Sequence, residues 1–232
     1  MYYDWQAGLA FFVILVTTTI LGKYLVFKVP ALQEMREINR KDFKLKRAKE
    51  KYPPVMKASN KVGMYTNLTF FVCVAPFLVT LQAQPAWKIL LHTVAILMVY
   101  DFFYYLTHRF VFHGQGYFRH IHAVHHQARK PSHIDAFYVH PLETFVGIIL
   151  FLATMVIMAV LLGPLHCITG VLTFLVFTQL NTINHCYVNL PYTPFKTLSW
   201  ITAKHAVHHE NMHMGNYATI TLLYDKLFGT FD

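Results

Sequence analysis

Apolar and polar segments alternate along the chain on a scale that suits a membrane protein. Five apolar segments stand out, at residues 6–27, 64–82, 86–107, 142–162 and 165–183. A helix rises about 1.5 Å per residue, so about 20 apolar residues cross about 30 Å of hydrocarbon. Short turns at 82–85 and 163–164 arrange four of these segments as two hairpins. The pattern predicts an all-α bundle of about four to five membrane helices.

The first apolar segment could be a cleaved signal peptide or a retained helix. A signal peptide has a positively charged start and a cleavage site of small residues. This chain starts with Met-Tyr-Tyr-Asp-Trp, which carries no positive side chain. We therefore expect the segment to stay in the protein as a membrane helix.

Residues 28–62 are the most basic part of the chain. They contain eleven Lys or Arg and four Asp or Glu residues, which is +7 of the formal net charge of +9. Helix-forming residues dominate up to Pro53-Pro54, which we expect to stop the helix. We predict a partly helical connector at the membrane surface, either touching anionic lipid or solvated as a cytoplasmic loop. We thus divide the chain into an N-terminal membrane helix with its basic connector, 1–62, and a histidine-rich domain, 63–232.

The positive charges also predict an orientation. Lys and Arg are in excess on the cytoplasmic side of membrane proteins. The polar segments 28–62, 108–141 and 184–232 together hold eighteen of the twenty Lys and Arg residues and thirteen of the fifteen histidines. We expect all three segments on the cytoplasmic side, in the endoplasmic reticulum membrane of a eukaryote or the inner membrane of a bacterium. We expect the chain to bind lipid and not to bind nucleic acid.

Histidines form repeated clusters on this side. The pentapeptide His-Ala-Val-His-His occurs twice, at 122–126 and at 205–209. Positions i, i+3 and i+4 share one face of a helix, so each copy can give two imidazoles to one metal ion and one to its neighbour. His108 and His113 are five apart, about 140° around an α-helix. They converge only if the helix bends or ends near them.

The remaining histidines are single. We interpret His185 as a metal ligand, and His140 as a ligand or as a hydrogen-bond donor beside the site. We expect the others at the surface, beside the site or in structural positions: His120, His133, His213, His92 and His166. A closed zinc site needs four ligands, usually with Cys, and a haem needs one or two. The clusters offer about twice the four ligands of such a zinc site, all nitrogen, which suits two redox-active metal ions with positions left for O₂.

The motifs from about Tyr100 to Asp232 resemble those of the fatty acid hydroxylase / sterol desaturase superfamily of membrane di-iron oxidases. The matching segments are Asp101–Arg109, His113, both HAVHH copies, His140-Pro-Leu-Glu143, Asn184-His185, Asn216-Tyr217 and Tyr224–Thr230. The resemblance implies a cytosol-facing helical cap that holds two irons, which zinc can replace during purification. It also implies O₂ as oxidant and a lipid drawn from the bilayer as substrate. The reaction would be hydroxylation or desaturation of a C–H bond in a fatty acyl chain, a sphingolipid or a sterol.

The resemblance also implies roles for individual residues. The metal ligands would be His108, His113, His122, His125, His126, His185, His205, His208 and His209, with His140 as an additional candidate. Asp101, Asn181, Asn184 and Asp225 would lie around the ligands, with Asp101 orienting imidazoles and Asp225 either doing the same or anchoring the C-terminal segment. Asn181 stands where some family members have another histidine. Electrons would come from a separate donor such as cytochrome b5 and its NAD(P)H reductase, since we expect no fused donor domain.

Aromatic residues near the histidines are candidates for lining the lipid slot, with membrane anchoring or helix packing as the alternative. They are Phe102, Phe103, Tyr104, Tyr105, Phe137 and Tyr138. The His-Pro-Leu-Glu turn resembles that of sterol-oxidising members, which favours a sterol.

Two other functions remain as alternatives. His209-Glu210-Asn-Met-His213 matches the H-E-x-x-H motif of zinc metalloproteases, in which the Glu is the general base. That function would leave the first HAVHH copy without a role. A metal-binding or transport protein would instead place ionisable residues inside the membrane spans, and here the histidines cluster outside them.

Overall fold

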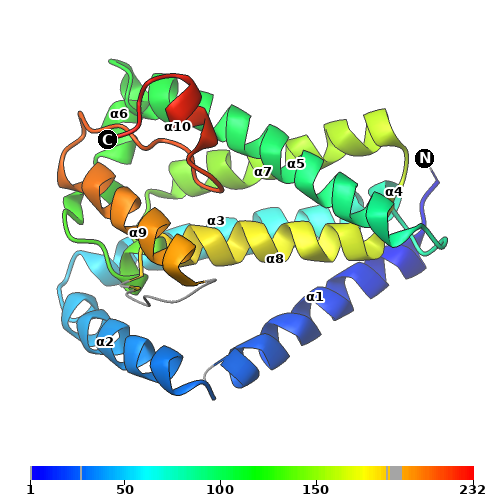
Figure 1. The fold of residues 1–232 in the computed structure, drawn as a ribbon, viewed down its shortest axis with the longest axis horizontal. Helices are drawn as coiled ribbons and strands as arrows, with labels where there is room; N and C mark the ends of the chain where they lie inside the picture. Colours follow the sequence, from blue (N-terminus) through cyan, green and yellow to red (C-terminus); the bar gives the residue numbers. More distant parts are fainter. Residues whose placement is uncertain (1, 27, 187, 189–194) are drawn as a thin grey trace.

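Long helices run between two ends of the molecule, and the histidine-bearing segments gather at one of them (Figure 1). The computed structural model describes residues 2–26, 28–186, 188 and 195–232. The long helices are α1 (Trp5–Val26), α2 (Pro30–Arg47), α3 (Tyr52–Cys73), α5 (Ala86–Leu106), α7 (Pro141–Leu162), α8 (Cys167–Ile183) and α9 (Phe195–Glu210). The short elements are α4 (Ala75–Leu78), β1 (Val79–Thr80), η1 (Thr107–Phe112), α6 (Tyr117–His122), η2 (His125–Gln127), η3 (His133–Phe137), β2 (Leu165–His166) and α10 (Leu223–Leu227). The predicted all-α class is confirmed.

Three described helices are long and apolar enough to cross a membrane: Trp5–Leu25, Ala86–Phe112 and Pro141–Leu162. The apolar helix α8 is shorter, and α3 begins within the basic connector and carries Lys57 and Lys61. The prediction that residues 64–82 form one membrane helix is wrong, because two helices share this segment. Helix α3 ends at Cys73, and Pro76 follows in the first turn of α4. Proline has no N–H and clashes with the carbonyl four residues before it, so a helix cannot continue through it unbroken.

The pair Pro53-Pro54 does not stop a helix, as we had expected, but starts one. Both prolines lie in the first turn of α3, whose N-cap residue is Lys51. The first amides of a helix have no partner within it, so proline is tolerated there. Helix α3 runs through residue 62, so the basic connector and the histidine-rich part of the chain share one continuous helix.

The two hairpin turns meet at the end opposite the histidines. Val79 pairs with Leu165 and Thr80 with His166 in a short parallel ladder, and Gln84 donates a hydrogen bond to the carbonyl of Pro164. Helix α5 packs on α7 and α8, α3 packs on α7, and α1 packs on α8. At the α1–α8 contact, a Cβ on Gly170 would lie 2.9 Å from Phe11 Cζ, so glycine lets the buried Phe11 ring approach the helix.

Candidate metal centre

Nine histidines converge at one end of the bundle and form two adjoining groups. In each group, one ring nitrogen per residue lies within 4.8 Å of all the others. The five-histidine group contains His108, His113, His122, His126 and His208. The four-histidine group contains His125, His185, His205 and His209. These nine are the residues that the motif resemblance indicated as ligands.

A π-helix brings His108 and His113 together. The element η1, at Thr107–Phe112, continues α5 with wider turns, and the backbone N–H of His113 donates to the carbonyl of His108 at 2.9 Å. A π-helix closes its hydrogen bonds between residues i and i+5, so a five-residue spacing returns to the same face. The two ring centroids lie 4.9 Å apart. The bend that the spacing required is this π-turn.

The two HAVHH copies reach the site by different backbone conformations. We expected the first copy to form one α-helix, but it does not. Helix α6 ends at His122, a turn follows, and the 3₁₀-helix η2 begins at His125. The second copy lies within α9, where the Nε2 atoms of His205 and His209 are 3.2 Å apart. Each copy is divided two to one between the groups.

The ring nitrogens are spaced as ligands of a common ion. Two nitrogens bound to one ion at about 2.1 Å and at right angles lie about 3.0 Å apart. The Nε2–Nε2 distances are 3.1 Å for His108–His122, 3.1 Å for His113–His122, 3.2 Å for His108–His208, 3.2 Å for His126–His208, 3.0 Å for His125–His185 and 3.0 Å for His185–His205.

The tautomers of five of these imidazoles are fixed by backbone carbonyls. A carbonyl only accepts, so each Nδ1 must carry the hydrogen and each Nε2 a lone pair. The Nδ1 contacts are His108 to Tyr217 O (2.7 Å), His113 to Met212 O (2.8 Å), His208 to Gly215 O (2.7 Å), His125 to Tyr138 O (3.2 Å) and His185 to Asn181 O (2.9 Å). Lone pairs that face one another at about 3 Å repel unless a cation lies between them. The donor set therefore fits metal ions.

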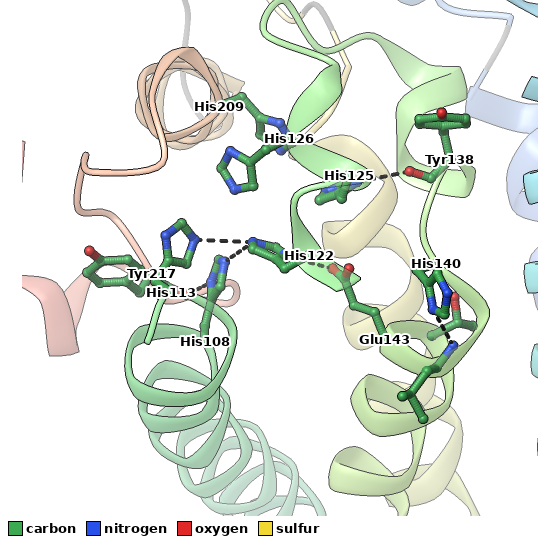
Figure 2. Close-up of polar contacts among 12 residues, drawn as sticks. His108, His113, His122, His125, His126, Tyr138, His140, Glu143, His209 and Tyr217 are labelled. Carbon is green, nitrogen blue, oxygen red and sulfur yellow. Dashed lines mark hydrogen bonds and ion pairs between the residues drawn. The ribbon is translucent and has the colours of Figure 1, made fainter. Parts of the chain in front are cut away.

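A carboxylate performs the same task for the sixth imidazole. Nδ1 of His122 lies 2.7 Å from Oε1 of Glu143, and both side chains are buried (Figure 2). The sequence offered the His-Pro-Leu-Glu motif as a signal, but we did not assign Glu143 a role. Nδ1 of His140 accepts the amide N–H of Leu142 at 3.1 Å and caps α7. His140 therefore starts the helix that presents Glu143, and it lies outside both groups.

Burial keeps these imidazoles neutral near pH 7. Loss of solvation disfavours the charged ring, and neighbouring imidazoles add to the effect for most of them. Burial lowers the pKa of His113, His122 and His185 to about 3. It also lowers the pKa of His205, His208 and His209 well below the usual value. Neutral imidazoles are the form that binds metal.

Two buried carboxylates hold the segment 212–221. Main-chain carbonyls of this segment orient three histidines of the five-histidine group. Asp101 accepts the amide N–H groups of Thr219 (2.9 Å), Ile220 (2.8 Å) and Thr221 (3.0 Å). Asp225 accepts those of Tyr217 (2.8 Å) and Ala218 (2.9 Å). Among the described contacts, neither carboxylate touches an imidazole. Asp101 therefore orients the histidines through the backbone and not directly, and Asp225 anchors the C-terminal segment.

The two asparagines near His185 join the same segment from the other side. The main-chain carbonyl of Asn181 orients His185, and its side-chain oxygen accepts the hydroxyl of Thr219 at 3.1 Å. Asn184 donates to the carbonyl of Thr219 at 2.9 Å. Residue 181 thus supports His185 through its main-chain carbonyl and the segment 212–221 through its side chain.

A cavity of about 180 Å³ adjoins the four-histidine group, with His125 and His185 in its wall. Of the six aromatic residues proposed from the sequence, Tyr104 lines it, together with Tyr100, Phe112 and Phe177. The other five lie elsewhere among the described residues. On α5, Phe102 packs on Phe103 and Tyr224. Tyr105 stacks on Phe228. Tyr138 stacks on Tyr52, and Phe137 lies beside His133. Residues 100 and 104 share one face of α5, whereas 102 and 105 point away from it.

The H-E-x-x-H match does not form a protease site. Helix α9 ends at Glu210, so His209 and His213 do not share a helical face. Glu210 and His213 are exposed, and His213 belongs to neither histidine group. His120 is also exposed, His92 is buried, and Nδ1 of His166 caps α8 by accepting the amide of Ile168 at 3.2 Å.

Comparison with known proteins agrees with this geometry. The sequence model of the family described as fatty acid hydroxylase matches residues 93–230, which include all nine histidines of the two groups. The chain belongs to the fatty acid hydroxylase family. The match begins within α5, so α1 to α4 lie outside it.

Several curated relatives share this part of the chain. A putative methylsterol monooxygenase of Dictyostelium discoideum is 34% identical over 155 residues, covering 64% of this chain and 53% of that protein. Methylsterol monooxygenase 1 of Rattus norvegicus is 32% identical over 154 residues, covering 64% and 50%. The very-long-chain aldehyde decarbonylase GL1-11 of Oryza sativa is 32% identical over 152 residues, covering 63% and 54%. The chain spans about half the length of these relatives, and no solved structure matches it.

Proposed function

We propose that this chain is a membrane-bound oxidoreductase that uses two iron ions and O₂ to hydroxylate or desaturate a C–H bond of a lipid. The observation that carries the proposal is the pair of histidine groups, in which anchored Nδ1 atoms direct convergent Nε2 lone pairs inward. Family membership supports the same function.

The proposed ligands are the nine histidines of the two groups. Their all-nitrogen donor set lacks the thiolates that structural zinc sites usually include, and imidazole suits redox-active iron. When bound, the two irons would supply the reduction of O₂ and the oxidation of the C–H bond. The protein's own residues bury the imidazoles, which keeps them neutral and excludes water, and they fix the tautomers of six of the nine. The four-histidine group offers one imidazole fewer, and it adjoins the cavity through His125 and His185.

A lipid substrate follows from the surroundings of the site. The candidate membrane helix Ala86–Phe112 carries His108, and another, Pro141–Leu162, carries Glu143. The cavity beside the centre has apolar and aromatic residues in its wall, among them Tyr104, Ile148 and Phe177. Because two of the relatives are named as methylsterol monooxygenases, we propose a sterol as the first substrate class to test. The excess of Lys and Arg supports a cytoplasmic site. Electrons would come from a separate protein such as cytochrome b5.

Metal analysis of the purified full chain tests the proposal. We expect two irons per chain in the wild type, and we expect His208→Ala and His125→Ala each to remove metal mainly from its own group. Supplying lipids under ¹⁸O₂ to the reduced protein should then give a lipid that carries ¹⁸O, or a desaturated lipid. A single tightly bound zinc that survives both substitutions would overturn the proposal. Two zincs that are lost in the variants would be exchanged for iron before the lipid assay.

A further inference from the structure

The short helix α10 contacts a candidate membrane helix near its middle. The hydroxyl of Tyr224 donates to the main-chain carbonyl of Met98 in α5 at 2.9 Å. Lys88 and Arg109 are charged residues near the two ends of this span. At about 1.5 Å per residue, Met98 lies about 15 Å from each of them, close to the middle of about 30 Å of hydrocarbon. The side chain of Tyr224 therefore reaches well inside the depth of a bilayer.

The rings of α5 that contact this segment belong to the half of the span that leads to the histidines. Phe102 lies 5.3 Å from Tyr224 between ring centroids, and Tyr105 stacks on Phe228 at 5.3 Å. Figure 1 shows α10 against this end of α5, on which it packs. The contacts place residues 222–228 at the depth of the leaflet on the side of the histidine groups, which we call the histidine-side leaflet.

The irregular backbone that precedes α10 has the hydrogen bonds that hydrocarbon requires. Non-helical peptide groups at membrane depth need partners within the protein, because no water is there to replace them. Asp101 accepts the amides of residues 219–221, and Asp225 accepts those of the two residues before them. Asn184 donates to the carbonyl of Thr219 at 2.9 Å. This internal pairing suits a segment that enters a bilayer.

The outer face of the segment is apolar and uncovered by the described residues. The side chains of Leu223, Leu227 and Phe228 are 44%, 65% and 48% exposed. Lys226 is also exposed, and its ammonium group lies over the ring of Trp200 in α9, 4.9 Å from the centroid. Tryptophan is typical of the boundary between hydrocarbon and headgroups, and a lysine near that boundary can extend its ammonium group to water. An apolar face beside such a pair fits a helix that lies partly within one leaflet.

We propose that residues 222–228 insert into the histidine-side leaflet, where the exposed side chains of Leu223, Leu227 and Phe228 contact lipid acyl chains. The polar segment 184–232 then returns to the membrane through α10, and Lys226 stays at the headgroup boundary. Because main-chain carbonyls just before α10 orient three histidines, this membrane anchor fixes the support of the five-histidine group relative to the bilayer.

Fluorescence quenching of the metal-loaded full chain in phosphatidylcholine vesicles tests the proposal. A fluorophore is attached to Leu227→Cys in a chain that carries Cys73→Ser, because Cys73 is an exposed thiol. The same chain without the added cysteine is the blank. Iodide quenches from water, and a phospholipid with a nitroxide on its acyl chain quenches from the bilayer. Val94→Cys, exposed on α5, is the membrane reference, and Lys130→Cys, exposed outside the candidate spans, is the water reference.

The label at 227 should behave like the label at 94. We expect the acyl-chain nitroxide to quench it several-fold more strongly than the label at 130, and iodide to quench it several-fold less. Iodide quenching as strong as at 130 would overturn the proposal. Protection from both quenchers would also overturn it, because protein and not lipid would then cover the segment. Free access of iodide to residue 94 would remove the membrane span on which the proposal depends.

A pair of variants separates lipid contact from a chance burial of the label. A carboxylate is unfavourable in hydrocarbon, so Leu227→Asp should make a label at Leu223→Cys several-fold more accessible to iodide. Leu227→Phe, which stays apolar, is the matched control and should leave that label protected. Metal content reports whether each variant keeps its fold. Unchanged protection in a metal-retaining Leu227→Asp variant would contradict insertion, and if this variant does not fold, the label at 227 decides alone.

Discussion

The ammonium group of Lys46 lies 2.6 Å from the carboxylate of Asp135, a side chain with no solvent exposure. Tyr52 donates to the other oxygen of the same carboxylate at 2.7 Å, and its ring stacks on Tyr138 with centroids 4.2 Å apart. The carbonyl of Tyr138 accepts Nδ1–H of His125. The basic connector is thereby joined to a histidine of the four-histidine group, although it lies outside the residues matched by the family.

Asp135→Asn should therefore weaken metal binding in the four-histidine group. The change removes the charge that Lys46 and Tyr52 contact, and residues 133–138 then position the Tyr138 carbonyl less firmly. Loss of such an indirect support typically weakens metal affinity about 10- to 100-fold. Metal titration of the stripped protein measures this, with Asp42→Asn as control because Asp42 is 39% exposed and forms an ion pair only with Lys46 among the described residues. Unchanged affinity in Asp135→Asn would show that the ion pair does not act on His125.

The π-turn gives a second prediction through two nearby glycines. A Cβ on Gly114 would lie 2.2 Å from the carbonyl oxygen of Phe110 within η1, whereas one on Gly116 would meet nothing within 4 Å. Gly114→Ala should force the π-turn open, move His113 and reduce metal in the five-histidine group. Gly116→Ala should bind metal as the wild type does. Metal content and thermal stability of the two purified variants provide the comparison, and identical values would contradict the role given to the π-turn.

Asp101→Asn should loosen the segment 212–221. The carboxylate accepts three amide N–H groups and the hydroxyl of Thr221, whereas an Asn side chain has one oxygen and would direct its own NH₂ group at these donors. We expect a loss of about 1–3 kcal/mol in the free energy of unfolding. Metal affinity should fall in the five-histidine group, whose imidazoles depend on this segment. A stable variant with wild-type affinity would contradict the indirect role of Asp101.

The metal-free protein should lose stability on acidification. In the unfolded chain, histidine has a pKa of about 6.5, whereas burial lowers the pKa of His113, His122 and His185 to about 3 in the fold. Between these values the unfolded chain binds more protons, so the stabilising contribution is complete above about pH 6.5 and is lost as the pH falls toward 3. Thermal unfolding of the chelator-treated protein in detergent, measured at several pH values, should show a plateau above neutrality and a decline below it. A melting temperature that rises on acidification would contradict the burial of neutral imidazoles.

Much of the site could be predicted because it depends on local spacing and on composition. The spacing within the repeated HAVHH pentapeptide predicted clustered imidazoles, and the resemblance of the motifs to a family indicated the remaining ligands. What could not be predicted depends on contacts between distant segments. Glu143 acquires its role only when α7 lies beside His122, and the carbonyls of residues 212–217 carry no sequence signal at all. Of the aromatic residues proposed for the lipid slot, only Tyr104 borders the cavity beside the four-histidine group, because the side of α5 that faces this cavity is set by packing against α7 and α8.

The order of the ligands along the chain has a consequence for biosynthesis. Both groups take their first members from residues between His108 and His126 and their last from His208 and His209 in α9. All the candidate membrane spans precede α9 in the sequence, so the ribosome completes neither group until those helices have been made. The complete ligand set of either group therefore exists only after those helices have been made, and a nascent chain stalled before α9 would present imidazoles without a finished centre.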